Sequence, residues 1–334
     1  MPYEDTAVAA VSSSRSSFVT MTAICKTVVA LCIVRRRGDH SMTRHRYVLV
    51  TAAYNEEGHI ADTIASVVSQ SVLPLRWVIV SDGSTDRTDE IVRAWADRHS
   101  FIQFVRIEKS AQHSFTAKVH ALRQGFACFA DAEYDFIGVL DADVSFEPDY
   151  FGRLLERFAN QPRLGIAGGN IEQRVDGEVV PRVKDFNSVA GAVQFVRREC
   201  FEQTGGLPAL RYGGEDAAME ITARMHGWQT RTFPELRVVH FGLVGASAGG
   251  PLKARFKWGR VNFDLGYHPL FQLARAIYRF QERPYLFGSL AEMIGFVVGK
   301  ARDRQPSVDG EVVRYLRQEQ LGKLRSLAAP RRSR

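Results

Sequence analysis

Two aspartates, Asp141 and Asp143, stand one residue apart at the end of an apolar run, Phe136 to Leu140. Such a run is typical of a buried strand, so it brings two mutually repelling negative charges to a strand tip. Carboxylate oxygens suit a hard divalent cation such as Mg²⁺ or Mn²⁺, which usually shares them with substrate phosphates. The alternative is a solvated turn, in which aspartates are common. The wholly apolar strand and Pro148, placed to begin a helix, favour a metal site.

Strands and helices must alternate to position this pair. The β-rich runs are YVLVTA, RWVIVS, FIQFVRI, FIGVL and LGIAGG, and helical patterns between them cover Glu56–Ser71, Asp86–Arg98, Thr116–Ala130 and Asp149–Asn160. The alternation predicts an α/β fold with a mostly parallel sheet and helices on both faces. Ligands of such sheets bind beyond the carboxyl ends of the strands. The polar stretches there, AYNEE (53–57), SDGSTD (81–86) and DAD (141–143), should therefore meet at one edge.

Two common nucleotide-binding classes lack their motifs in this chain. A dinucleotide-binding domain needs GxGxxG after its first strand, where this sequence has TAAYNEEG, and no GxxxxGK[ST] phosphate loop occurs anywhere. The sequence therefore argues against a nicotinamide enzyme and a P-loop NTPase. What remains is a nucleotide site built from carboxylates, which again indicates a metal ion.

Composition and charge leave several partners open. The 334 residues are 45% hydrophobic and 24% charged, which is an ordinary globular composition for one large or two smaller domains. The net charge is +7, and residues 251–334 alone carry +10. Such a basic region can meet nucleic acid, an anionic membrane or a phosphorylated substrate. The four cysteines form no CxxC pair, which argues against a zinc site or a disulfide scaffold and for a reducing compartment.

The stretches AYNEE, SDGSTD and DAD, followed by GGED, resemble the inverting glycosyltransferases of family 2 in their order across roughly residues 46–245. The resemblance implies the GT-A fold, a Rossmann-like sheet, for this region. It also implies a nucleotide-sugar donor, most often a UDP-sugar, a saccharide acceptor, and Mg²⁺ or Mn²⁺ as cofactor. Each motif alone is weak, whereas the ordered set is specific.

The same resemblance implies roles for residues at the strand ends. Ala53, Glu56 and Asp82 would hold the base and ribose of the donor. Asp141 would approach the ribose, and Asp143 would bind the metal that bridges the diphosphate. For Glu56 and Asp82 the alternative is helix capping and turn chemistry.

Lys118 occupies the place of a lysine that is common before the third helix of the family. It would contact the donor; the alternative is a solvated helix face.

A second group of candidates lies between Arg211 and Gly242. The spacing of its apolar residues predicts a helix that Gly227 ends, with Glu215 and Asp216 in the first turn. The two acids could simply complement the helix dipole. The resemblance instead implies that Asp216 is the general base that takes a proton from the acceptor hydroxyl, with Glu215 among the donor-binding residues.

His240 follows the apolar run LRVV and should stand at a strand end. It could be no more than a polar cap on that strand. In GT-A enzymes a His or Asp at this point often completes the metal shell, and neutral imidazole is a suitable ligand.

Three domains are predicted: a leader over residues 1–45, a GT-A domain over 46–245 and a basic, amphipathic helical extension over 246–334. The leader contains 17 largely apolar residues, Phe18 to Val34, interrupted by Lys26. A span usually needs about 20, and a central lysine costs about 2.5–3.5 kcal/mol. It is therefore a disordered leader, a start-site artefact or a weak anchor, and each places the catalytic part in the cytoplasm.

The extension contains Leu286 to Gly299, too short to span a bilayer and carrying Glu292. It fits either an interfacial helix on an anionic membrane or helices packed on the catalytic domain. On the membrane, the acceptor would be a lipid-linked saccharide of surface polysaccharide biosynthesis, for example one linked to a polyprenyl diphosphate. RFKWGR (255–260) does not match the QxxRW of processive synthases, so we expect one sugar per encounter.

The sequence leaves two alternatives to sugar transfer. A sugar nucleotidyltransferase would need a glycine-rich basic loop after the first strand, which AAYNEE lacks. A noncatalytic nucleic-acid binder could use the basic extension, but no stacking or groove-reading motif supports it, so nucleic acid is not expected as a partner.

Overall fold

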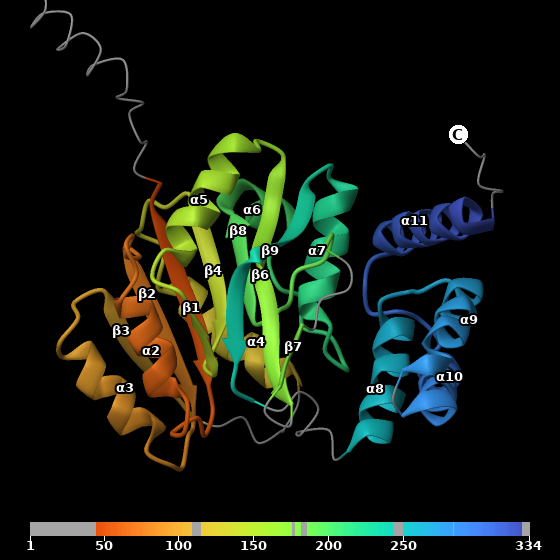
Figure 1. The fold of residues 1–334 in the computed structure, drawn as a ribbon, viewed down its shortest axis with the longest axis horizontal. Coiled ribbons are helices and arrows are strands. Elements are labelled where there is room, and N and C mark those ends of the chain that lie inside the picture. The colour runs from red at the N-terminus through yellow and green to blue at the C-terminus, as the bar shows by residue number, and fades with distance from the viewer. Residues whose placement is uncertain are drawn as a thin grey trace, which may run out of the picture. The chain divides into compact units, whose positions relative to one another are not determined.

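The computed structural model describes residues 45–108, 115–175, 178–181, 186–242, 250–282 and 284–328 (Figure 1). Apart from His45, the predicted leader lies outside the described residues, as does the predicted boundary at residues 245 and 246. The division into three domains therefore stays a prediction.

One mixed sheet forms the centre of the part that begins at Arg46 (Figure 1). Its strands are ordered β3-β2-β1-β4-β8-β6-β9-β5, with β7 paired to β6. The first four are parallel, as the alternating pattern predicted, whereas β8 joins β4 and β6 in antiparallel pairing. The strands are β1 (Tyr47–Ala53), β2 (Arg76–Asp82), β3 (Ile102–Ile107), β4 (Phe136–Asp141), β5 (Val144–Phe146), β6 (Leu164–Val175), β7 (Glu178–Pro181), β8 (Val193–Arg197) and β9 (Gln229–His240).

Helices cover both faces of this sheet because the central strands are apolar on both sides. In β1, Leu49 packs into the core on one face, and Val48 and Val50 pack into the core on the other. The first core is closed by α2 (Ile60–Val68), α3 (Thr88–Ala96) and α5 (Tyr150–Asn160). The second is closed by α4 (Phe115–Ala127), α6 (Arg198–Thr204) and α7 (Glu215–Met225). The predicted α/β fold class is thus confirmed.

One predicted helix limit differs from the observed one in an informative way, and another agrees. The first helix begins at Ile60 instead of Glu56, because Asn55 takes a left-handed conformation (φ 55°) and the chain makes a further turn before α2. Helix α7 ends at Met225, and Gly227 follows with φ 84°, as the sequence predicted.

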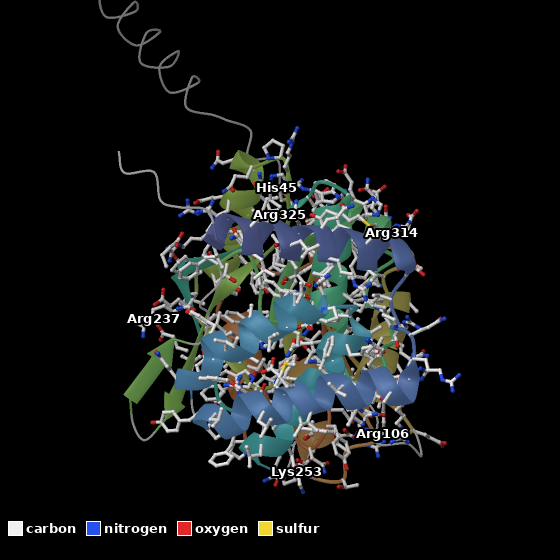
Figure 2. All side chains as sticks on the ribbon, turned by 90° about the vertical axis from the view of Figure 1, so that its right-hand side faces the viewer. His45, Arg106, Arg237, Lys253, Arg314 and Arg325 are labelled. Atoms are coloured by element: carbon white, nitrogen blue, oxygen red, sulfur yellow. The ribbon has the colours of Figure 1, made fainter. Side chains whose placement is uncertain are left out.

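The C-terminal extension consists of helices that pack partly on the catalytic part (Figure 2). They are α8 (Pro251–Asp264), α9 (Pro269–Tyr278), the short 3₁₀ turn η2 (Arg279–Gln281), α10 (Tyr285–Asp303) and α11 (Gly310–Ala328). Val261 of α8 and Leu316 of α11 share a core with Ile221 of α7. Within the ranges that the structure describes, no helix combines the length and the apolar character needed to cross a membrane.

Candidate active site

Thr63 of α2 forms hydrogen bonds with the turn that carries the two aspartates. Asp141 ends β4 and Val144 begins β5, so Asp143 lies in the short turn between them. The buried Thr63 hydroxyl donates to the Ala142 carbonyl oxygen at 2.8 Å and accepts from the Val144 N–H at 3.1 Å. This clamp satisfies both backbone groups of the turn and fixes the direction of the aspartate side chains.

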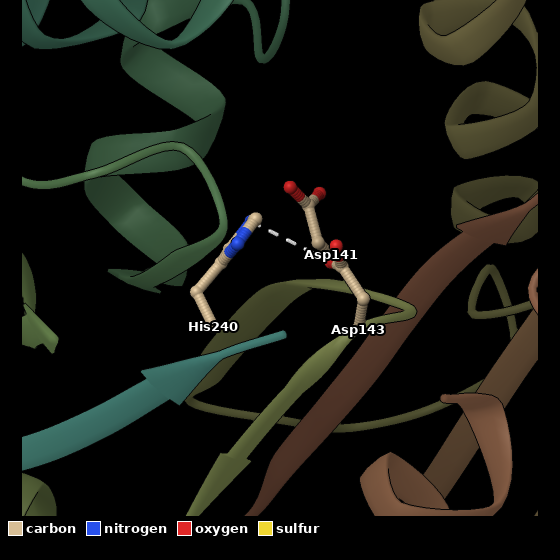
Figure 3. Close-up of side chains that lie close together, drawn as sticks. All are labelled: Asp141, Asp143 and His240. Atoms are coloured by element: carbon tan, nitrogen blue, oxygen red, sulfur yellow. Dashed lines mark ion pairs between the residues drawn. The ribbon is translucent and has the colours of Figure 1, made fainter. Parts of the chain in front are cut away.

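Strand pairing brings His240 to the same place. β5 pairs antiparallel with β9, with Val144 opposite His240, and the Phe241 N–H donates to the Asp143 carbonyl oxygen at 2.9 Å. Ligand atoms of Asp141, Asp143 and His240 consequently all lie within 4.8 Å of one another (Figure 3). His240 Nε2 is 3.6 Å from Asp143 Oδ1.

The backbone at Gly242 orients the imidazole. His240 Nδ1 lies 2.9 Å from the Gly242 carbonyl oxygen. Since a carbonyl oxygen only accepts, Nδ1 carries a proton in this contact, and Nε2 lies on the side of Asp143. A Cβ on Gly242 would overlap the Asp143 carboxylate, so only glycine fits here without displacing that side chain.

The electrostatics of the strand tips favour a bound cation. Burial raises the pKa of Asp143 above its usual range. His240 opposes this rise, and the charge of Asp141 adds to it. Burial, followed by repulsion from Asp143 and Asp141, raises the pKa of Glu56 to about 7. Lys118 Nζ is 2.6 Å from Asp141 Oδ1; burial works against its charge, but the Asp141 carboxylate outweighs burial and raises the pKa of Lys118. A divalent ion would relieve the remaining repulsion.

The residues predicted to hold the base and ribose lie at the adjoining strand ends. Ala53 is the last residue of β1 and pairs with Ser81, so the partly buried Asp82 follows directly beside it. At the start of α3, Asp86 Oδ1 accepts the Thr88 N–H at 3.0 Å, so Asp86 supplies the local capping contact of this loop, and the roles of Glu56 and Asp82 stay predictions.

Two loops are tied together where Glu56 lies. The Asn55 N–H donates to Ser84 Oγ at 3.2 Å, and the Glu56 N–H donates to Thr88 Oγ1 at 2.8 Å. These bonds hold the loop after β1 against the loop after β2, and the Glu56 carboxylate lies close enough to Asp141 and Asp143 to feel their charges.

The acidic pair at the start of α7 borders the same site. Lys118 is influenced by the charges of Glu215 and Asp216 as well as by Asp141. Burial, and next the neighbouring Asp216, raise the pKa of Glu215. Asp216 Oδ1 accepts the Ala217 N–H at 2.8 Å, and a Cβ on Gly191 would lie 2.5 Å from Asp216 Oδ2. The loop before β8 therefore packs directly on the Asp216 carboxylate.

One turn after Asp216, the buried Glu220 holds that loop in place. Its carboxyl group accepts the Val189 N–H at 2.6 Å and bonds the Ser188 hydroxyl at 2.9 Å and Gln194 Nε2 at 3.2 Å. Burial dominates and raises the pKa of Glu220 to about 8, although the Val189 hydrogen bond opposes it. The group therefore stays largely protonated at neutral pH.

The sequence singled out the charged residues of this site but not those that support them. The structure brings Glu56, Lys118, Asp141, Asp143 and His240 together, with the acidic pair of α7 beside them. It adds supporting residues that act through distant contacts, namely Thr63, Gly191, Glu220 and Gly242. A carboxylate four residues after Asp216 on an apolar helix face was the one available signal.

The donor set fits a divalent cation and a phosphorylated ligand. Two carboxylates offer the hard oxygen ligands that Mg²⁺ and Mn²⁺ prefer, an imidazole nitrogen can add a third ligand when it is deprotonated, and further positions remain for phosphate oxygens. The ammonium of Lys118, on a partly exposed side chain, adds a positive charge at the edge of the site. The Asp216 carboxylate, in the first turn of α7, can accept a proton from a ligand bound between it and the aspartates of the strand tip.

Comparison with known proteins identifies the domain. Residues 48–208 match the profile of glycosyl transferase family 2. The chain is 27% identical over 231 residues to the poly-beta-1,6-N-acetyl-D-glucosamine synthase of Staphylococcus epidermidis, covering 64% of this chain and 54% of the synthase. The Staphylococcus aureus (strain MSSA476) synthase is 30% identical over 145 residues, 43% of this chain and 31% of the synthase. The chain thus spans about half the length, or less, of these relatives.

A solved structure shares the fold. The mannosyltransferase of Pyrobaculum calidifontis, in complex with GDP-Man and Mn²⁺, superposes with a TM-score of 0.54 at 19% identity, covering 87% of this chain and 82% of the other. The predicted GT-A architecture is confirmed by this likeness, which extends over the helical extension as well as the sheet.

Removing one ligand should weaken ion binding at the strand tips. We expect Asp143→Asn and His240→Ala each to lower the affinity for Mn²⁺ by about tenfold or more, because each removes one of three convergent ligands. Electron paramagnetic resonance titration of free Mn²⁺ measures this directly. Asp149→Asn, an exposed neighbour, serves as the control, and equal affinity in the wild type and Asp143→Asn would place the ion elsewhere.

Glu220 should make stability fall as the pH rises. The pKa of this carboxyl group is 4.5 ordinarily and about 8 in the folded protein, so the folded chain binds the proton more tightly than the unfolded chain. The resulting stabilisation is complete below about pH 4.5 and is lost as the pH rises through about 8. We expect Glu220→Gln to flatten the decline of Tm between about pH 5 and 8.5. Glu220→Ala should cost about 1–3 kcal/mol throughout, since the Val189 N–H loses its acceptor.

Calorimetry at several pH values tests both variants. Glu311→Gln, at an exposed position of α11, is the control and should follow the wild type. A Glu220→Gln curve parallel to the wild-type curve would mean that this group does not titrate in the folded protein.

Proposed function

We propose, from the membership of residues 48–208 in glycosyl transferase family 2, that the chain is a metal-dependent, inverting enzyme that moves one sugar from a nucleotide sugar to an acceptor hydroxyl. The observation that carries the proposal is the convergence of Asp141, Asp143 and His240 within 4.8 Å, beside Lys118, on which the charge of Asp216 also acts. In this proposal Asp143 and His240 hold Mg²⁺ or Mn²⁺, and Asp141 and Lys118 contact the donor.

The residues divide the chemistry between them. An acceptor alcohol is a weak nucleophile at neutral pH, so Asp216 removes its proton as the new bond forms, a contribution of about 10²- to 10⁴-fold. A bound divalent ion supplies Lewis-acid stabilisation of the departing nucleoside diphosphate. Attack from the Asp216 side, opposite the leaving group, inverts the anomeric centre. Ala53, Glu56, Asp82 and Glu215 complete the donor site in this proposal.

The acceptor is proposed to be a saccharide linked to a polyprenyl diphosphate, on the cytoplasmic face of the cell membrane. The relatives named above make a polysaccharide of N-acetylglucosamine, which supports a role in surface polysaccharide biosynthesis. The sequence RFKWGR lacks the QxxRW of processive synthases, which supports transfer of a single sugar.

A thermal-shift screen tests the donor. UDP-sugars, and GDP-Man because the structural neighbour holds it, should be added to the full chain with and without Mn²⁺. We expect one nucleotide sugar to raise Tm only with Mn²⁺, because a ligand that binds only the folded state stabilises it. Asp143→Asn should abolish the shift. Diphosphate release from a nucleoside triphosphate would favour a nucleotidyltransferase instead.

Two substitutions separate transfer from donor binding. Asp216→Asn should keep the donor-induced Tm shift and lower the transfer rate by about 10²-fold or more. Gly191→Ala should act in the same direction, since its Cβ would displace the Asp216 carboxylate. Gly322→Ala, where an added Cβ meets nothing within 4 Å, is the matched control. Unchanged turnover in Asp216→Asn would remove this residue from the mechanism.

A further inference from the structure

The outer sides of α9 and α10 expose most of the large apolar side chains of the described residues. Eleven of the seventeen such exposed side chains lie between Leu270 and Val297. Among them, Tyr278 is 75% exposed and Phe287 69%. An apolar surface this concentrated is unusual on a soluble protein and marks a contact surface.

The exposed residues form one stripe on each helix. On α9 they are Leu270, Leu273 and Ile277, and on α10 they include Leu286, Leu290, Ile294 and Val297, all at spacings of three and four. The opposite sides are buried: Gln272 of α9 donates to Glu292 of α10 at 3.2 Å. Among the described residues, the two helices therefore pack through their inner sides and leave their apolar sides exposed; Figure 2 views the molecule from the side of the extension.

The acidic residues of this region are withdrawn from the surface. Glu292 is fully buried and lies 3.3–3.4 Å from nitrogen atoms of Arg255, Arg275 and Arg279. Glu282 pairs with Arg255 and Arg279, so three guanidinium groups face two carboxylates. Both acids of this region are therefore engaged by arginines.

The acidic side chain at the end of α10 is likewise paired with an arginine. Asp303 is paired with Arg211 at 3.3 Å, and the charged side chains that remain exposed at this end of the helix are Lys300, Arg302 and Arg304. Among the described residues from 269 to 304, the exposed charges are thus basic and the acidic groups are turned inward.

We infer that the outer side of α9 and α10 lies on an anionic lipid membrane. Apolar side chains would enter the boundary between headgroups and acyl chains, while the basic residues would meet anionic headgroups. A second copy of the chain fits less well, because it would bring two positively charged surfaces together. This inference adds a membrane surface to the proposed function. It rests on that function only for the nature of the acceptor.

Vesicle flotation with the full chain tests the surface. The probes are neutral phosphatidylcholine vesicles and vesicles with a third of phosphatidylglycerol. We expect binding to the anionic vesicles that weakens by about tenfold or more in Leu286→Ser/Phe287→Ser/Leu290→Ser, because three exposed apolar side chains are lost. Neutral vesicles should bind more weakly than anionic ones, and salt should reduce the difference.

Leu73→Ser/Leu75→Ser is the matched control. These leucines are 48% and 49% exposed and lie outside the extension, so this variant should bind as the wild type does. All variants keep residues 1–45, so a loss confined to the triple variant reports on α10 and not on the leader. Unchanged vesicle binding in the triple variant, or self-association that this variant abolishes, would overturn the inference.

A parallel assay separates this inference from the proposed function. The triple variant should transfer sugar to a water-soluble acceptor as fast as the wild type, since the substituted residues lie outside the proposed site. Vesicle binding without any transfer would refute the proposed function and leave the membrane surface standing. Transfer to a soluble acceptor without vesicle binding would refute the membrane surface and leave the proposed function standing.

Discussion

Repulsion between carboxylates at the ends of the central strands is the constraint on which the site depends. Asp141, Asp143 and Glu56 lie close enough for their charges to interact, and the pKa of Asp143 and that of Glu56 are both raised, mainly by burial and then by this repulsion. Lys118 offsets only part of it, through Asp141. A fold that keeps such a cluster rigid has a place for a cation, since an ion turns the electrostatic cost into binding free energy.

The rigidity comes from residues distant in sequence, and this separates what the sequence predicts from what it does not. The alternation of strands and helices predicted the parallel half of the sheet, and the strand ends predicted the acidic residues. The pairing of β5 with β9, which places His240 opposite Val144, joins segments about a hundred residues apart. No local pattern encodes the Thr63 clamp or the packing of Gly191 on Asp216, because both depend on tertiary contacts.

The structure supports one of the two alternatives that the sequence of the extension left open, packing on the catalytic part, and the membrane alternative stays a proposal. Helices α8 and α11 pack on the catalytic part, while α9 and α10 keep an apolar side uncovered. Burial of Glu292 explains how both can hold, because its carboxylate draws three arginines of α8, α9 and the following turn into one cluster. The sequence could show that Glu292 interrupts an apolar helix, but not that it faces inward.

The extension also bears on the acidic pair of α7. A Cβ on Gly214, the residue before Glu215, would lie 2.8 Å from the Val261 side chain of α8, and Arg224 near the end of α7 lies 3.2 Å from Glu319 of α11. Both ends of α7 thus rest on the extension. The helix that carries Asp216, the residue proposed to deprotonate the acceptor, is therefore held in place by the sheet on one side and by the extension on the other.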